Sequence, residues 1–158
     1  MTLLDTHPLP ARDRPTRRPS EPPIEVRAVG GRIVIRPRVA LDHDGLDALT
    51  DAVRAAITAG ATTVVDLERH PDATPADGEL AHCDGVVALP TVVGTWLLDV
   101  RTRRVCRSAP GGMRFLPPAA WTLVRSVTIT NRSISVATAT GEHIAAARRP
   151  DELPRLVA

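Results

Sequence analysis

A histidine, a cysteine and an aspartate follow one another at residues 82–84, and these residue types can do covalent or metal chemistry. A cysteine nucleophile needs a base in spatial contact and a third group that orients the base, which adjacency in sequence does not supply. A metal site needs three or four converging ligands, and neither the remaining histidines nor Cys106 show such a spacing. A small enzyme that uses His82 or Cys83 is therefore the weakest of the functions considered, and we expect no catalysis, metal or cofactor.

Acidic residues gather where a helix is predicted to begin, at Asp42, Asp44 and Asp47, with His43 among them. Asp42 or Asp44 can accept hydrogen bonds from the free amides of the first helical turn. Asp47 complements the positive end of the helix dipole. Capping alone accounts for these residue types, and the functional alternative is a loop that contacts a partner protein.

Arginines lie close in sequence to both tryptophans of the chain. They are Arg101, Arg103, Arg104 and Arg107 after Trp96, and Arg125 and Arg132 after Trp121. Arginine combined with aromatic platforms holds single-stranded nucleic acid, which makes nucleic-acid binding an alternative function. Tryptophans within apolar strands are more often core residues, and the net charge of +2 is too small to suggest a polyanion. Nucleic acid is therefore not the partner we expect.

The composition is that of one globular domain. The chain has 158 residues, of which 43% are hydrophobic and 24% are charged, so it can bury a core without metal or disulfide staples. Its longest uncharged stretch, residues 85–98, falls short of the roughly 20 apolar residues that span a bilayer. Residues 1–14 lack the apolar core of a signal peptide. We expect a cytoplasmic protein with no membrane contact.

The first half predicts two strands, a helix and a third strand. Residues 24–29 and 33–35 are strand-like and flank Gly30-Gly31, a pair typical of a tight hairpin turn. An amphipathic helix follows and ends before Gly60, and residues 62–67 form the third strand. The residues of its apolar face are Leu46, Leu49, Val53, Ala56 and Ile57. This order predicts the fold class α/β (α+β), with a mixed β-sheet and a helix packed on it.

The second half predicts β-hairpins. Residues 127–130 and 133–136 each alternate an apolar residue with a serine or threonine. A turn at Asn131-Arg132 places Ile129 opposite Ile134, so that one face of the hairpin is apolar and the other is hydroxylic. Two further hairpins are predicted around residues 101–104 and 140–142.

The chain divides into four predicted segments. Residues 1–23 are rich in proline and lack apolar periodicity, which predicts a flexible tail. Residues 24–90 form an α/β unit in which acidic residues outnumber arginines. In the remaining chain arginines outnumber acidic residues, and we assign 91–150 to a β-rich extension or subdomain. Residues 151–158 are predicted to fray.

Residues 24–67 resemble the STAS domain, the fold of bacterial anti-sigma-factor antagonists. The likeness lies in residues 31–35 (GRIVI), 41–44 (LDHD), 46–49 (LDAL), 58–61 (TAGA) and 64–67 (VVDL). It implies a fold that binds proteins, with an anti-sigma factor or a related regulator as the partner. In that family a kinase phosphorylates a serine in the loop after the third strand, and the added charge breaks the complex.

The loop that corresponds to this switch, residues 68–78, holds no serine. Thr74 is its only hydroxyl residue and precedes Pro75, so the usual serine switch is not retained. The chain after Gly78 also departs from the family, which has a helix, a strand and a helix where this sequence predicts β-hairpins.

We therefore expect a non-catalytic regulatory module that binds another protein. Its predicted contact residues lie in the loop after Leu41 and in the loop 68–78. They are Asp42, His43, Asp44, Asp72, Thr74 and Asp77. The alternative is a structural protein whose β-rich half forms an assembly or ligand surface, and both functions are compatible with a homo-oligomer.

Overall fold

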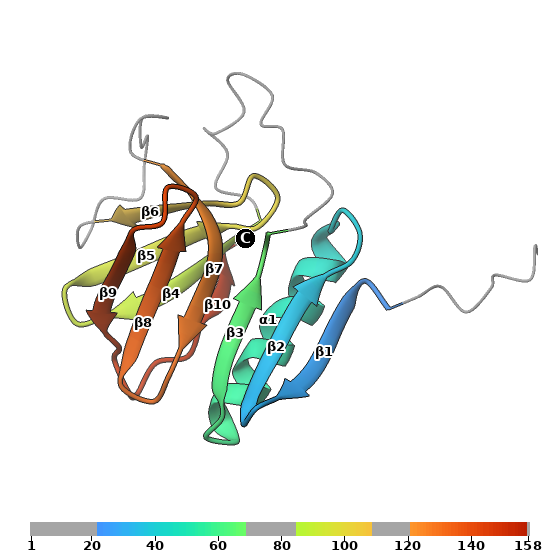
Figure 1. Cartoon of the computed structure of the whole chain (residues 1–158), viewed down its shortest axis with the longest axis horizontal. Coiled ribbons are helices and arrows are strands. Elements are labelled where there is room, and N and C mark those ends of the chain that lie inside the picture. The colour runs from blue at the N-terminus through green and yellow to red at the C-terminus, as the bar shows by residue number, and fades with distance from the viewer. Residues whose placement is uncertain (1–21, 69–84, 109–120, 158) are drawn as a thin grey trace, which may run out of the picture.

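The computed structural model describes residues 22–68, 85–108 and 121–157 (Figure 1). In these residues one helix, α1 (His43–Thr58), accompanies ten strands. The strands of the first half are β1 (Ile24–Val29), β2 (Arg32–Pro37) and β3 (Thr62–Asp66). Those of the second half are β4 (Val86–Thr91), β5 (Gly94–Asp99), β6 (Arg104–Ser108), β7 (Thr122–Ile129), β8 (Ser133–Thr138), β9 (His143–Ala147) and β10 (Arg155–Val157). The protein thus combines a mixed sheet with a helix packed on it, as the α+β prediction required.

The first three strands follow the predicted order. Gly30 and Gly31 connect β1 to β2 with φ angles of 56° and 76°, which residues with a Cβ rarely adopt. The strands pair antiparallel, and Val29 lies opposite Arg32 at the turn. The helix then carries the chain back across the sheet, so that β3 pairs parallel to β2.

Local sequence determines both ends of α1. Asp42 is the N-cap, and its Oδ1 accepts a hydrogen bond of 2.8 Å from the amide of Gly45. Gly60 follows the helix with a φ of 78°, and the amides of Gly60 and Ala61 donate to carbonyls of the last turn. All five residues of the predicted apolar face are buried, which confirms that face.

The predicted hairpin of β7 and β8 has the expected register. Ile129 pairs with Ile134 and Thr128 with Ser135, and both isoleucines are fully buried. The turn differs from the expectation in one respect, because Asn131 does not take a positive φ. Instead, Thr130 holds the turn, since its Oγ1 accepts hydrogen bonds from the amides of Arg132 and Ser133.

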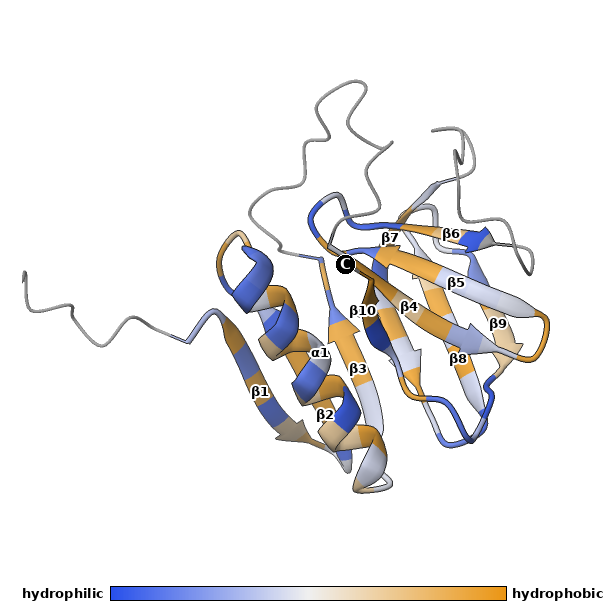
Figure 2. Cartoon of the chain, turned by 180° about the vertical axis from the view of Figure 1, so that it is seen from behind, coloured by the Kyte–Doolittle hydropathy of each residue, from blue (hydrophilic) through white to orange (hydrophobic). Residues whose placement is uncertain are grey.

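Strand β7 joins the two halves into one sheet. Its end pairs antiparallel with β3 and its start pairs with β6, which gives the order β1-β2-β3-β7-β6-β5-β4-β10, with β8 and β9 branching from β7. The second half curls beside the first, and α1 lies against β1, β2, β3 and β10 (Figure 2). Leu49 of the helix lines a small apolar space together with Val65, Val87 and Val127. Both halves therefore share a hydrophobic core.

Two predicted boundaries are corrected by this topology. The boundary at residue 90 falls inside β4, which is buried along its length and pairs with β5 and β10. The C-terminus, predicted to fray, instead forms β10, in which Leu156 pairs with Val87 and packs on the core. The physical reason is that β4 is buried along its length, so its backbone N–H and C=O groups need hydrogen-bond partners on both edges of the strand. The prolines at 150 and 154 do not reveal that residues 155–157 supply one of these edges.

Candidate functional site

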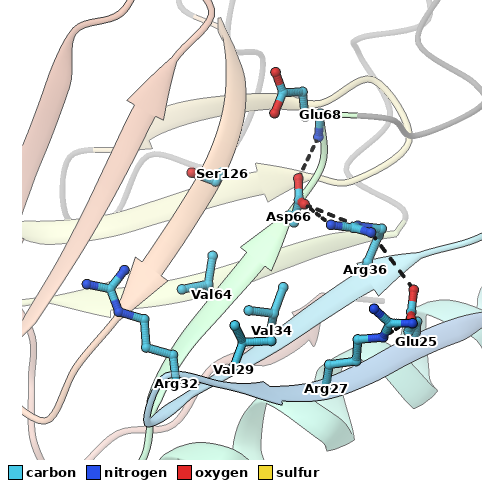
Figure 3. Close-up of a pocket in the computed structure, with 10 residues that line it drawn as sticks. All are labelled: Glu25, Arg27, Val29, Arg32, Val34, Arg36, Val64, Asp66, Glu68 and Ser126. Carbon is cyan, nitrogen blue, oxygen red and sulfur yellow. Dashed lines mark hydrogen bonds and ion pairs between the residues drawn. The ribbon is translucent and has the colours of Figure 1, made fainter.

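The helix covers one face of β1, β2 and β3, and the opposite face carries a groove of about 470 Å³ (Figure 3). Successive side chains of a strand point to opposite faces, so the groove receives the residues that do not face α1. They are Glu25, Arg27 and Val29 of β1, Arg32, Val34 and Arg36 of β2, Val64 and Asp66 of β3, with Glu68 and Ser126. The groove is thus lined from four neighbouring segments of the sheet.

Three valines form an apolar patch within this groove. Val34 pairs with Val64 across β2 and β3, and Val29 of the edge strand is 55% exposed. Arg27 lies opposite Val34, and Arg32 lies opposite Val29. Apolar area with charged groups at its margins is the usual make-up of a protein interface, where the apolar part supplies affinity and the polar margin supplies specificity.

An ion-pair network fixes one end of the groove. The guanidinium of Arg36 donates to Asp66 Oδ2 from Nε at 3.1 Å and from Nη2 at 2.7 Å. The other oxygen of Asp66 accepts from the amide of Glu68 at 3.1 Å. The hydrogen bond to Asp66, followed by the charge of that carboxylate, raises the pKa of Arg36 above its ordinary value. Arg36 is therefore held in place as a permanent cation.

Glu25 extends this network to the edge strand. Its carboxylate contacts Arg27, lies 3.2 Å from Nη2 of Arg38 and 4.0 Å from Nη1 of Arg36. The hydrogen bond from Arg38 is the largest cause that holds the pKa of Glu25 below its ordinary value of 4.5. Desolvation opposes it, and the positive charges of Arg27, Arg38 and Arg36 add to the lowering. The ionised form of Glu25 therefore stabilises the folded chain.

We predict that Glu25→Gln reduces the loss of stability on acidification. Because the pKa of Glu25 is lower in the folded than in the unfolded chain, its contribution is present above the unfolded pKa and is lost as the pH falls through the folded pKa. Thermal unfolding followed by circular dichroism from about pH 7 to about pH 3 measures the effect. The control is Glu142→Gln in the exposed β8–β9 turn. Equal losses in the wild type and in the Glu25 variant would contradict the prediction.

The acidic residues predicted from the sequence lie at the start of α1. Asp42 caps the helix, His43 and Asp44 are exposed in its first turn, and His43 Nε2 lies 3.8 Å from Asp47 Oδ2. Capping by Asp42 is thereby confirmed. Since β2 and β3 are parallel and α1 follows β2, these residues lie at the sheet end where Asp66 completes β3. Asp72, Thr74 and Asp77, like His82 and Cys83, lie outside the described residues.

Sequence analysis missed most of the groove. Glu25 and Arg27 alternate with apolar residues in β1, whereas Arg32 and Arg36 flank a run of three apolar residues in β2. These patterns indicate strands but do not indicate which side chains meet. The grouping of these arginines with Glu25 and Asp66 depends on the pairing register of three strands. The Gly30-Gly31 turn fixes that register for β1 and β2, and this signal predicts that Glu25 lies beside Arg36.

The tryptophans, considered for nucleic-acid binding, and Cys106, considered as a metal ligand, do not line this groove. Trp96 is 3% exposed and Trp121 is 8% exposed, so both are core residues and neither offers an open face for a nucleic-acid base. Cys106 is buried, and burial raises the pKa of its thiol. In the described ranges no cluster of three or more His, Cys, Asp or Glu residues could hold a metal ion. No helix there is long and apolar enough to cross a membrane.

Comparisons with known proteins leave the family of this chain open. A scan against protein-family models finds no match. Comparison with curated proteins finds no significant similarity, and comparison with solved structures finds none either. The STAS resemblance of residues 24–67 therefore stays a prediction.

Proposed function

We propose that this protein is a non-catalytic regulatory module that binds another protein through the groove on β1, β2 and β3. The observation that carries the proposal is the sheet face opposite α1, which combines an apolar valine patch with charges of both signs. A reacting group would need a nucleophile and a base within hydrogen-bond reach. Four of the ten groove side chains are instead arginines and carboxylates that pair with one another, namely Glu25, Arg27, Arg36 and Asp66.

The ordered network favours tight binding because little side-chain freedom is lost when a partner docks. Arg36 is held by two hydrogen bonds to Asp66 before any partner arrives. Pre-organised groups of this kind reduce the entropy cost of association. Arg27 contacts Glu25 and has a side chain that is 68% exposed, so an acidic group of the partner can reach its guanidinium from solvent. We infer a partner segment with apolar side chains over the valines and a carboxylate near Arg27 or Arg32.

The STAS resemblance supports a regulator such as an anti-sigma factor as the partner, in the cytoplasm. The order of β1, β2, α1 and β3 agrees with the elements on which that resemblance rests. Asp42, His43 and Asp44 extend the proposed contact surface, since they are exposed at the same end of the sheet as Asp66. Without the family's serine, binding in this proposal is constitutive or has another trigger.

Site-specific photo-crosslinking in the native cell tests the proposal. A photoreactive residue replaces Arg32 at the groove, and in the control it replaces Arg132 in the exposed turn after β7. We expect a discrete protein adduct from position 32 and none from position 132. Adducts of the same kind from both positions, or from neither, would count against the groove.

The captured partner then allows a quantitative prediction. Arg36→Glu places a like charge beside Asp66 and Glu25 and disrupts the fixed end of the groove. The affinity for the partner should fall by about tenfold or more, the size of effect expected for an ordered arginine in an interface. Arg132→Glu is the matched charge reversal and should leave the affinity unchanged. Calorimetric titration measures both, and an unchanged affinity in the Arg36 variant would contradict the proposed surface.

A further inference from the structure

Strand β1 is the edge of the sheet in the first half. It pairs with β2 on one side, and no strand of the described residues pairs with it on the other. Its six residues make it longer than β10, the three-residue strand at the other end of the path. Val26, on the face toward α1, is 52% exposed. A long edge strand with an exposed apolar side chain is a template for pairing with another strand.

The hairpin geometry tells which backbone groups of β1 are unpaired. A two-residue turn closes on a residue pair that exchanges hydrogen bonds, so Val29 and Arg32 form such a pair. Hydrogen-bonded pairs alternate along the ladder, and therefore Arg27 and Glu25 also direct their backbone groups toward β2. The N–H and C=O groups of Ile24, Val26 and Ala28 then point to the free edge.

We propose that β1 pairs antiparallel with β1 of a second copy of this chain, on a two-fold axis through Val26. In this register Val26 meets the partner's Val26, and Ile24 meets the partner's Ala28. These are the residues whose backbone groups point outward, so the pairing forms about six hydrogen bonds between the strands. The exposed Val26 side chains of the two copies cover each other on the helix side of the sheet.

The charges of β1 favour this register over the two adjacent symmetric ones. With the axis at Val26, Glu25 lies opposite the partner's Arg27, and the reverse pair forms by symmetry. An axis at Arg27 places two arginines opposite each other, and an axis at Glu25 places two carboxylates opposite each other. Directly opposed like charges destabilise a strand pair, whereas opposite charges stabilise it. The sequence of β1 is thus self-complementary around Val26.

The side chains of Glu25 and Arg27 are positioned to form these ion pairs between the two copies. The side chain of Arg27 is 68% exposed and already contacts Glu25 of its own strand. Glu25 lies on the same face with a side chain that is 13% exposed, and its carboxylate keeps its contacts with Arg36 and Arg38 while the partner's Arg27 takes the place of Arg27 of its own strand. Strand β9 is less suited to such pairing, since the chain that follows it is tied to β4 by the bridge between Thr91 and Arg148. The dimer engages Glu25 and Arg27 at the margin of the groove and leaves Val34 and Val64 open. Because partner binding is tested at Arg32 and Arg36, the failure of one proposal can be distinguished from the failure of the other.

Sedimentation equilibrium of the full chain over about 1–200 μM tests the dimer, which a strand–strand contact of this size places in the micromolar range. Arg27→Glu places a carboxylate opposite the partner's Glu25 on each side of the axis. The dissociation constant of the dimer should therefore rise by about tenfold or more. Arg155→Glu, the same exchange on the exposed side of edge strand β10, should leave it unchanged. A monomer at every concentration, or equal dissociation constants in the two variants, would overturn the proposal.

A second variant separates pairing from folding. Val26→Pro removes an amide that points to the free edge, so it spares the hydrogen bonds between β1 and β2 while blocking the centre of the dimer. We expect a folded monomer, verified by its circular dichroism spectrum. Amide exchange by NMR on the wild type locates the contact. Ile24, Val26 and Ala28 should become protected as the concentration rises, whereas Glu25, Arg27 and Val29 are protected throughout. Protection that does not depend on concentration at the first three residues would place the contact elsewhere and refute it.

Discussion

Leu49→Ala should lower the free energy of unfolding by about 3 kcal/mol, the usual loss for a leucine deleted from a core. Leu49 is 1% exposed on α1 and contributes to the small apolar space shared with Val65, Val87 and Val127. Deleting its side chain therefore opens a cavity between the helix and strands of both halves. The whole chain, rather than the first half, should unfold at a lower denaturant concentration.

The two tryptophans make this prediction measurable. Trp96 lies in β5 and Trp121 directly precedes β7, so intrinsic fluorescence reports on the second half alone. In urea unfolding the fluorescence midpoint should move with the midpoint from far-UV circular dichroism, as two-state unfolding requires. Leu123→Ala is the matched control, because Leu123 is 37% exposed on β7. A fluorescence midpoint that stays at the wild-type value in the Leu49 variant would show that the halves unfold independently.

The sequence predicted those parts of the fold that depend on neighbouring residues. The hairpin of β7 and β8 could be aligned because apolar residues and hydroxyls alternate on both sides of Asn131-Arg132. The end of α1 could be placed because Gly60 supplies the left-handed φ that follows a helix. In both cases the residues that determine the local structure lie within one short segment, so the pairing of distant strands need not be known.

Pairing between distant segments could not be predicted in the same way. Nothing local to Thr63 or Ile129 indicates that β3 and β7 are neighbours, since any strand with a buried face would satisfy the same pattern. The contact between Arg36 and Asp66 was missed for the same reason, whereas the turn at Gly30-Gly31 could have placed Glu25 beside Arg36. Glu25, Arg36 and Asp66 each look like a solvated residue in sequence, and only the order of β1, β2 and β3 brings them into one network.

The C-terminal strand offers the second large effect. Leu156→Asp should lower the free energy of unfolding by about 3 kcal/mol, because it places a carboxylate against apolar neighbours without a partner charge. Leu156 pairs with Val87 of β4 and packs on the shared core, and β10 also lies against α1. The prolines at 150 and 154 indicate a frayed end, in which the same exchange would cost little.

Arg155→Asp provides the matched control for this exchange. Arg155 is exposed and belongs to the same strand, so the new carboxylate stays in water and the stability should change by no more than about 0.5 kcal/mol. Urea unfolding of the wild type and the two variants gives the three free energies. Because β10 covers one edge of β4, a strand buried along its whole length, the difference between the variants measures how far the core depends on the last residues of the chain. Equal and small losses in both variants would mean that β10 is not part of the folded sheet.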